Sequence, residues 1–382
     1  MRKKISTVTY AVVFILVTAV LGFFSFTNLA KFYVNGEVDY IEWTADLGSR
    51  FETDIATTFV DKYAFISMNG AVRKLLGQRE MNKTVKINNG HLIEPEPRKT
   101  DAEVKTAADE VIRYADFCRE QGKPFLFVQP ILKVDRDNKQ LPAGIEDYSN
   151  ENADAFLDYL REAGIEIIDI RDCMKEDGLD MYDYTYVTDH HWTTIGSFYS
   201  FTKIADWIEE KTGVAAAPEV VDINQYERVT YPQWHLGTYG QRTGPAFAGV
   251  DDYDFLIPAF DVAFVDDSGA SHSFREQVID ESVFETRDLK NRYTYDCALM
   301  YPEGFSTAGK ELSVFFVTDS YVAGMVPYLK LAYSDFAYQW YFDGFVSDFV
   351  LQVDPDVIVM MPYMTNVFNP DAVFIESKIL GK

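Results

Sequence analysis

Basic residues are scarce in this chain of 382 residues. Its 35 Lys and Arg stand against 60 Asp and Glu, which gives a formal net charge of −25. Nucleic-acid binding depends on a basic surface that neutralises phosphates, so this deficit argues against DNA or RNA as a partner. Cysteine is scarcer still, with Cys118, Cys173 and Cys297 widely separated. They lack the paired spacing of a thiolate zinc site or a disulfide framework, so at most one disulfide bond is possible.

Nucleotide-binding loops are also missing. The most glycine-rich stretch, GTYGQRTG at 237–244, does not have the spacing of a phosphate-binding or dinucleotide-binding loop, and no Lys-Ser or Lys-Thr pair follows it. It is better interpreted as a tight loop. No organic cofactor is therefore expected.

One long apolar run is present, and it lies at the N-terminus. Residues 5–30 carry no charge, and Arg2, Lys3 and Lys4 precede them. A helix of about 20 apolar residues crosses a bilayer, so residues 1–35 are predicted to form a cytoplasmic tip and an uncleaved transmembrane anchor. The alternative is a cleaved signal peptide, whose apolar core is usually only about 7 to 15 residues.

The rest of the chain is then expected outside the plasma membrane, as the ectodomain of a single-pass protein. Removing the anchor removes positive charge and leaves the ectodomain more acidic than the whole chain. Anionic lipid headgroups repel such a surface, so the ectodomain is expected to stand off the membrane. Residues 36–100 are predicted to be a membrane-proximal helical segment, because apolar residues recur there at helical spacing.

Helical and strand patterns alternate beyond residue 100. Helices are predicted from Asp101, from Asn150 and from Thr193 or Thr194, and another over 344–353. Buried strands are predicted at 124–130, 165–169, 312–317, 337–342 and 356–362. This alternation predicts an α/β domain over 101–382 with a mainly parallel sheet covered on both faces. Within it, residues 216–310 have no helical period and predict a β-rich insertion.

Two short motifs carry residues suited to acyl chemistry. The stretch 188–193, TDHHWT, precedes a predicted helix, and 317–321, VTDSY, ends an apolar strand. A helix is predicted to begin where this strand ends. A serine in such a strand-to-helix turn faces a crevice, and the helix N-terminus supplies backbone N–H groups for an oxyanion. A serine nucleophile needs a base, and a base imidazole needs an orienting acid. Asp189, His191 and Ser320 are therefore the predicted catalytic triad.

Each of these residues has a simpler alternative. Ser320 could serve only as a helix N-cap. Asp189, His190 and His191 could bind a metal, but no further His or Cys lies at ligand spacing, so no metal site is predicted. Arg242, in the glycine-rich loop, is a candidate to support an oxyanion or to bind a sugar carboxylate, and an exposed ion pair is its alternative.

The two motifs together resemble those of the DHHW family of bacterial membrane-anchored proteins, relatives of the SGNH-hydrolase-like alginate O-acetylation proteins. Further stretches that carry the resemblance are 51–77, 237–258 and 354–362. The resemblance implies an SGNH-like three-layer fold and a catalytic role for the same triad. Thr318 departs from the family, because it stands where the relatives have the Gly of Gly-Asp-Ser. The order Asp, His, Ser also differs from that of ordinary SGNH hydrolases.

The resemblance also implies a function. It indicates an extracytoplasmic O-acetyltransferase that acts on a cell-surface or secreted polysaccharide through an acyl-serine, with acetyl groups supplied by a multi-spanning membrane O-acyltransferase. Trp192, Trp234 and Tyr239 are candidates for sugar stacking, with core packing as the alternative, and Tyr321 is a candidate to contact substrate or oxyanion beside Ser320. Two other functions stay open: a carbohydrate esterase with the same triad, and a non-catalytic scaffold of a polysaccharide-modification complex.

Overall fold

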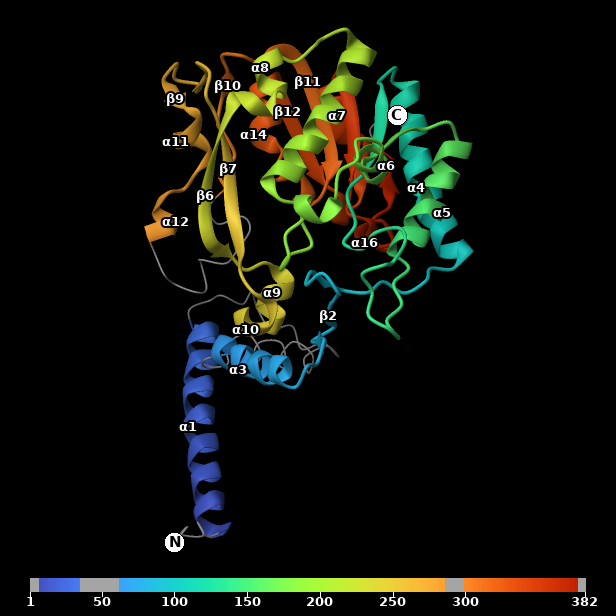
Figure 1. Ribbon diagram of the computed structural model, residues 1–382. Coiled ribbons are helices and arrows are strands. Elements are labelled where there is room, and N and C mark those ends of the chain that lie inside the picture. The colour runs from blue at the N-terminus through green and yellow to red at the C-terminus, as the bar shows by residue number, and fades with distance from the viewer. Residues whose placement is uncertain (1–6, 35–61, 286–298, 377–382) are drawn as a thin grey trace.

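The computed structural model describes residues 7–34, 62–285 and 299–376. One long helix, α1 (Thr7–Val34), projects away from an α/β body (Figure 1). Its stretch Tyr10–Asn28 has a mean hydropathy of 2.2, and α1 is the one helix within the described ranges that is long and apolar enough to cross a membrane. The basic residues predicted to hold the N-terminus in the cytoplasm lie outside those ranges.

A five-stranded sheet forms the centre of the body. Its order is β12-β11-β14-β4-β5, and every neighbouring pair is parallel. The strands are β4 (Phe125–Gln129), β5 (Glu166–Asp169), β11 (Lys310–Thr318), β12 (Tyr333–Trp340) and β14 (Val357–Met361). All five overlap the apolar runs that predict strands, and the prediction of a mainly parallel sheet is confirmed.

Two hydrophobic cores pack against the opposite faces of this sheet. Alternate side chains of a strand enter opposite cores, as Leu126 and Phe127 of β4 do. One core is covered by α6 (Ile170–Glu176), α7 (Thr194–Thr212), α8 (Pro218–Val221) and α14 (Val326–Ala332). The other is covered by α4 (Asp101–Glu120), α5 (Ser149–Glu162), α15 (Ser347–Val353) and α16 (Met364–Val367). Two helical layers and one sheet confirm the three-layer α/β fold (Figure 1).

The helix ends follow their capping residues. Thr193 is the N-cap of α7, and its side chain accepts a hydrogen bond from the N–H of Gly196, which confirms the cap predicted there. The helix ends at Gly213, whose φ of 73° is the left-handed conformation that closes many helices. This cap fixes where the TDHHWT loop stops and the helix begins.

The described residues of 216–310 contain two antiparallel units. The first is the long pair β6 (Tyr226–His235) and β7 (Asp251–Pro258), and the second is a small sheet of β8 (Ala263–Val265), β9 (Ser271–Ser273) and β10 (Phe305–Ser306). The insertion also holds short helices: η2 (Ile223–Gln225), α9 (Thr238–Thr243), α10 (Pro245–Ala248), α11 (Phe274–Val278) and α12 (Ser282–Glu285). The helices α9 and α10 connect β6 to β7, so the glycine-rich loop 237–244 is largely helical.

The segment that precedes α4 differs from its prediction. Residues 36–100 are predicted to be helical, but the described part is helical only in α3 (Lys62–Leu75). A small antiparallel sheet follows, made of β1 (Glu80–Met81), β2 (Thr84–Lys86) and β3 (Leu92–Ile93). Asn82 and Lys83 have φ of 49° and 62°, so they form a tight hairpin turn without the glycine that would mark it in the sequence.

The remaining short elements lie around the carboxyl edge of the central sheet and beside its last strands. They are η1 (Met181–Tyr184), η4 (Ser320–Val322), η5 (Tyr341–Asp343) and the parallel pair β13 (Phe345–Val346) and β15 (Phe374–Ile375).

Candidate active site

Ser320 lies just beyond the carboxyl end of β11. The sequence predicts that an α-helix begins there, but the chain makes the single 3-10 turn η4 instead. The N-cap of this turn is Asp319, whose side chain accepts a hydrogen bond from the N–H of Tyr321 at 3.0 Å. Ser320 is thus the first residue of the turn, where a backbone N–H has no partner within the helix. Because Asp319 caps the turn, the Ser320 hydroxyl can contact residues of other segments.

His191 contacts that hydroxyl. Its Nε2 atom lies 2.8 Å from Ser320 Oγ, and its Nδ1 atom lies 2.6 Å from Asp189 Oδ1. Asp189 and His191 are buried, whereas Ser320 is half-buried and reachable from solvent. A carboxylate, an imidazole and a hydroxyl in hydrogen-bonded series are what general-base activation of a serine requires. The fold brings these groups together from positions 129 residues apart.

Two contacts hold the motifs against each other. The indole N–H of Trp192 donates to the carbonyl oxygen of Tyr321 at 3.1 Å, and the hydroxyl of Tyr321 donates to the carbonyl oxygen of His190. Each motif therefore supplies one donor to the backbone of the other. These bonds explain why an aromatic residue follows both His191 and Ser320.

The insertion holds the loop that carries Asp189. Asp251, the first residue of β7, accepts hydrogen bonds from the N–H of Val187 at 2.9 Å and from the N–H and hydroxyl of Thr188 at 2.8 and 2.6 Å. The Thr188 hydroxyl in turn accepts from the N–H of Gly237 at 2.9 Å. One carboxylate from the insertion thus fixes the two residues before the acid of the triad.

The start of α9 contacts Asp189 itself. The N–H of Thr238 donates to Asp189 Oδ2 at 2.6 Å, opposite the oxygen that faces His191. A Cβ atom on Gly237 would lie 2.1 Å from Asp189 Oδ2, so only glycine fits. Sequence reasoning missed Asp251, Thr238 and Gly237 as supports of the site, although all three lie in the stretch 237–258 that carries the family resemblance.

Charge interactions keep Asp189 ionised. Burial by itself would raise the pKa of this carboxyl, but attraction to His191 and His190 and the hydrogen bond from His191 outweigh burial and hold the pKa well below its ordinary value. Burial and the neighbouring charge of His191 lower the pKa of His190 to about 3, so His190 is neutral at physiological pH. A permanently charged acid next to the imidazole stabilises the imidazolium that forms during proton transfer.

Asp319 is a second buried carboxyl beside the site. It accepts hydrogen bonds from the N–H of Tyr321, from the N–H of Tyr363 at 2.6 Å and from the side-chain amide of Asn366 at 2.7 Å. Burial raises its pKa, and these three donors oppose that rise. Asp319 therefore joins the strand end of β11 to the residues that follow β14.

The other candidate residues are buried or held in an ion pair. Trp192 is fully buried and Tyr239 and Trp234 are each 5% exposed, so none offers a free ring face for a sugar, and core packing describes them better. Tyr321 is also buried, with its hydroxyl bound to backbone. Arg242 forms an ion pair with Glu94. This contact matches the ion pair that the sequence offers as the alternative to an oxyanion or sugar-carboxylate role.

A metal ion would have to compete with the hydrogen bonds described above. Asp189, His190 and His191 offer ligand atoms within 4.8 Å of one another. The Nδ1 atoms of His190 and His191 both contact Asp189 Oδ1, at 3.2 and 2.6 Å, and Nε2 of His191 faces Ser320. The contact with the serine hydroxyl favours the triad over a metal site.

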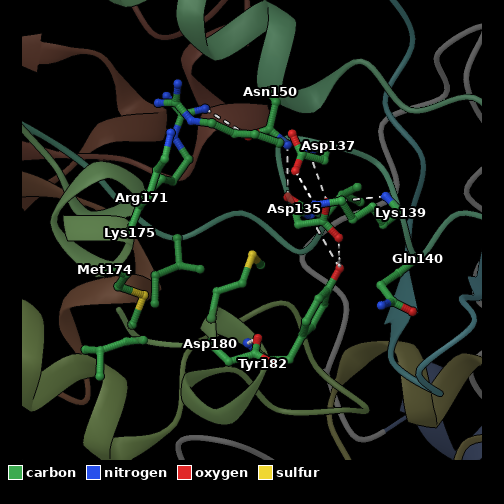
Figure 2. A pocket seen from close by; sticks show the side chains of 15 residues that line it. Asp135, Asp137, Lys139, Gln140, Asn150, Arg171, Met174, Lys175, Asp180 and Tyr182 are labelled. Carbon is green, nitrogen blue, oxygen red and sulfur yellow. Dashed lines mark hydrogen bonds and ion pairs between the residues drawn. The ribbon is translucent and has the colours of Figure 1, made fainter. Parts of the chain in front are cut away.

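A cavity of about 500 Å³ lies along the same edge of the sheet, beyond the carboxyl ends of β4 and β5. Figure 2 shows its wall of polar side chains, among them Tyr182, Asp135 and Lys175. The hydroxyl of Tyr182 donates to Asp135 Oδ2 at 3.2 Å. Met174, Met181 and Leu179 supply an apolar wall. Ligands of open α/β sheets commonly bind beyond the carboxyl ends of the strands.

Comparison with known proteins agrees with this fold. Residues 93–237 match the family described as "SGNH hydrolase-like domain, acetyltransferase AlgX". The structure resembles Bacillus cereus PatB1 with a TM-score of 0.58 at 18% identity, over 74% of this chain and 97% of that one. PatB1 with a sulfonyl adduct gives a TM-score of 0.57 at 17% identity, over 76% of this chain and 97% of that one.

A DHHW family protein from Eubacterium siraeum has the same fold, with a TM-score of 0.53 at 14% identity over 77% of this chain and 94% of that chain. No curated protein sequence matches the chain. At these identities the solved structures establish the fold alone. They confirm the SGNH-like fold and the resemblance to DHHW proteins that the two motifs indicate.

Proposed function

We propose that this chain, which matches the SGNH hydrolase-like domain of the AlgX type over residues 93–237, is an extracytoplasmic O-acetyltransferase that modifies a polysaccharide through an acyl-serine. The observation that carries the proposal is the series of contacts from Asp189 Oδ1 to His191 Nδ1 at 2.6 Å and from His191 Nε2 to Ser320 Oγ at 2.8 Å. The matched family, described as an acetyltransferase, supports the choice of reaction.

The reaction would take place in two halves. In the first, His191 accepts the proton of the Ser320 hydroxyl while Oγ attacks the carbonyl carbon of the acetyl donor, and His191 then returns the proton to the departing group. In the second, His191 takes the proton of a sugar hydroxyl, whose oxygen attacks the acetyl-serine. The acetyl group moves to the sugar, and His191 returns the proton to Ser320. The N–H of Ser320 is placed to donate to the oxyanion of both intermediates.

The proposed location follows from α1. As a single-pass anchor with its N-terminus in the cytoplasm, α1 would hold the triad on the outer side of the plasma membrane. The family resemblance implies that a multi-spanning membrane O-acyltransferase would supply the acetyl donor on that side. No residue of the triad lines the cavity beyond β4 and β5, and β14 lies between β4 and β11, so the cavity would hold a sugar of the acceptor polymer other than the one that reacts.

The test is detection of the acyl-enzyme. The purified chain is mixed with a chromogenic acetyl ester, and its mass and its turnover are measured. We expect an acetyl adduct on Ser320 that is absent from Ser320→Ala, and turnover at least about 10³-fold lower in Ser320→Ala and His191→Ala. Ser313→Ala is the matched control, because Ser313 lies at the other end of β11 and its hydroxyl binds Asp335.

Three outcomes are informative. An adduct that is resolved by an added oligosaccharide faster than by water supports the transferase. An adduct that is resolved by water alone supports an esterase with the same triad. Wild-type protein that shows neither adduct nor turnover beyond Ser320→Ala contradicts the proposed triad and leaves the scaffold role.

A further inference from the structure

Helix α3 exposes an apolar face. Phe65, Met68, Val72 and Leu75 recur at intervals of three and four residues, so they lie on one side of the helix. All four are exposed, Met68 to 60% and Leu75 to 86%. These residues are called the apolar face of α3 below. A contiguous apolar surface of this kind marks contact with a membrane or another molecule.

The opposite side of α3 is fixed to the body. A Cβ atom on Gly70 would lie 2.2 Å from the carbonyl oxygen of Thr243, and one on Gly244 would lie 2.6 Å from Ser67 Cα. The two backbones are therefore in close contact through glycine on both sides. The helix cannot rotate about its axis to bury the apolar face without losing this packing.

The charge around α3 is opposite to that of the whole chain. Residues 62–86 contain six Lys or Arg and one Glu, although the chain carries a net charge of −25. Lys74 lies on the exposed part of α3, and Lys86 lies nearby on β2. Burial, followed by repulsion from Lys74 and Arg79, lowers the pKa of Lys86, as expected where cations cluster.

The place of α3 in the molecule relates these features to the anchor. Figure 1 shows α3 at the end of the body from which α1 projects, with its axis running crosswise to α1. If α1 crosses a bilayer, a helix in that position runs along the bilayer surface. Interfacial helices have an apolar face for the acyl-chain boundary and flanking Lys or Arg residues for anionic headgroups.

We infer that the apolar face of α3 lies in the interface of the bilayer that α1 spans, with the basic residues of 62–86 against anionic headgroups. The net charge of the chain predicts an ectodomain that stands off the membrane. The local charge of 62–86 reverses that expectation for this end of the molecule, because electrostatic attraction at a surface depends on the charges within about 10 Å of it.

The inference has a consequence for the site. The glycine contacts join α3 to α9, and the first N–H of α9 binds Asp189. A helix held on the bilayer would therefore hold the acid of the triad at a fixed height above it. This placement does not depend on which reaction the triad performs.

Photo-crosslinking of the purified full chain tests the inference. Met68 or Val72 is replaced by p-benzoylphenylalanine, and the protein is reconstituted in vesicles of phosphatidylglycerol and phosphatidylcholine. Glu120, exposed at the end of α4 and just before the amino end of β4, is the matched control position. After irradiation, intact mass and peptide mapping identify what each benzophenone has reached.

We expect a lipid adduct from positions 68 and 72 and none from position 120. In vesicles of phosphatidylcholine alone the lipid adduct should fall several-fold, and an unchanged yield would overturn the role given to the basic residues. Crosslinks from positions 68 and 72 to a second copy, or to residues 35–61 of the same chain, would overturn the inference. The absence of any crosslink from these positions would show a water-exposed face and would also overturn it.

Discussion

Two segments meet at the candidate site, and each contains a buried aspartate beside a residue of the triad. In the first, 185–193, Asp189 contacts the imidazole of His191. In the second, 318–321, Asp319 adjoins Ser320 in the chain, but its oxygens accept from two backbone N–H groups and one amide. The pKa of Asp189 is lowered because its interactions with His191 and His190 outweigh burial, whereas burial raises the pKa of Asp319.

This difference shows that burial and proximity to the triad do not by themselves give a carboxylate a role in proton transfer. What distinguishes the two is the group each one touches. A carboxylate on an imidazole fixes its tautomer and stabilises its charged form, whereas a carboxylate on backbone N–H groups fixes the path of the chain. The two residues are therefore expected to respond differently to the same substitution.

The largest effect should come from Asp189→Asn. The amide cannot stabilise a charged His191 and favours the wrong tautomer, so we expect kcat to fall by about 10⁴-fold. Asp319→Asn should lower the free energy of unfolding by about 1 to 3 kcal/mol, because one amide oxygen cannot accept from three donors. Activity assays with an acetyl ester and urea unfolding of both variants separate the two roles. A stable Asp319→Asn protein with activity as low as that of Asp189→Asn would remove the distinction.

A smaller effect is expected from Asp251→Asn. This change weakens the hydrogen bonds to Val187 and Thr188 and lets the loop shift relative to Ser320, so kcat should fall by up to about 100-fold. Asp254→Asn is the matched control on the same strand, because its carboxylate binds Arg228 and Thr230 instead. If both variants lose the same activity, the insertion would support the site only through general stability.

The smallest effect concerns His190. Its pKa lies at about 3 in the folded chain against 6.5 ordinarily, so the unfolded chain takes up a proton that the folded chain refuses as the pH falls below 6.5. Stability is unaffected above that pH and is lost between pH 6.5 and about 3. Relative to His190→Gln, the wild type should lose about 1 to 2 kcal/mol between pH 7 and pH 5. Urea unfolding at both values measures this, and parallel losses would contradict it.

The sequence predicts the parts of the molecule whose signals are local. The apolar runs that form β4, β11 and β14 are continuous because inner parallel strands are buried on both faces. Asp189 and His191 lie two residues apart, so their contact needs only one loop. Ser320 is found because it ends such a strand.

Other parts depend on contacts between distant segments, and a local pattern does not contain them. Asp251 supports Thr188 across 63 residues, and no pattern in either stretch indicates the pairing. The burial of Trp192 and Tyr239 likewise depends on what packs over them. The 3-10 turn that begins at Ser320 is an exception, because Pro327 lies in the first turn of α14 and marks where that helix begins.

The strand order of the central sheet determines when the protein becomes complete during synthesis. β14, the last strand of this sheet to be made, lies between β4 and β11 and joins the first half of the sheet to the second. Until β14 has been synthesised, the two halves have no strand to connect them, and both expose unpaired edges. A chain that ends before Val357 would thus carry Asp189, His191 and Ser320 without a sheet to align them. Only a chain that includes β14 is therefore expected to be catalytically active.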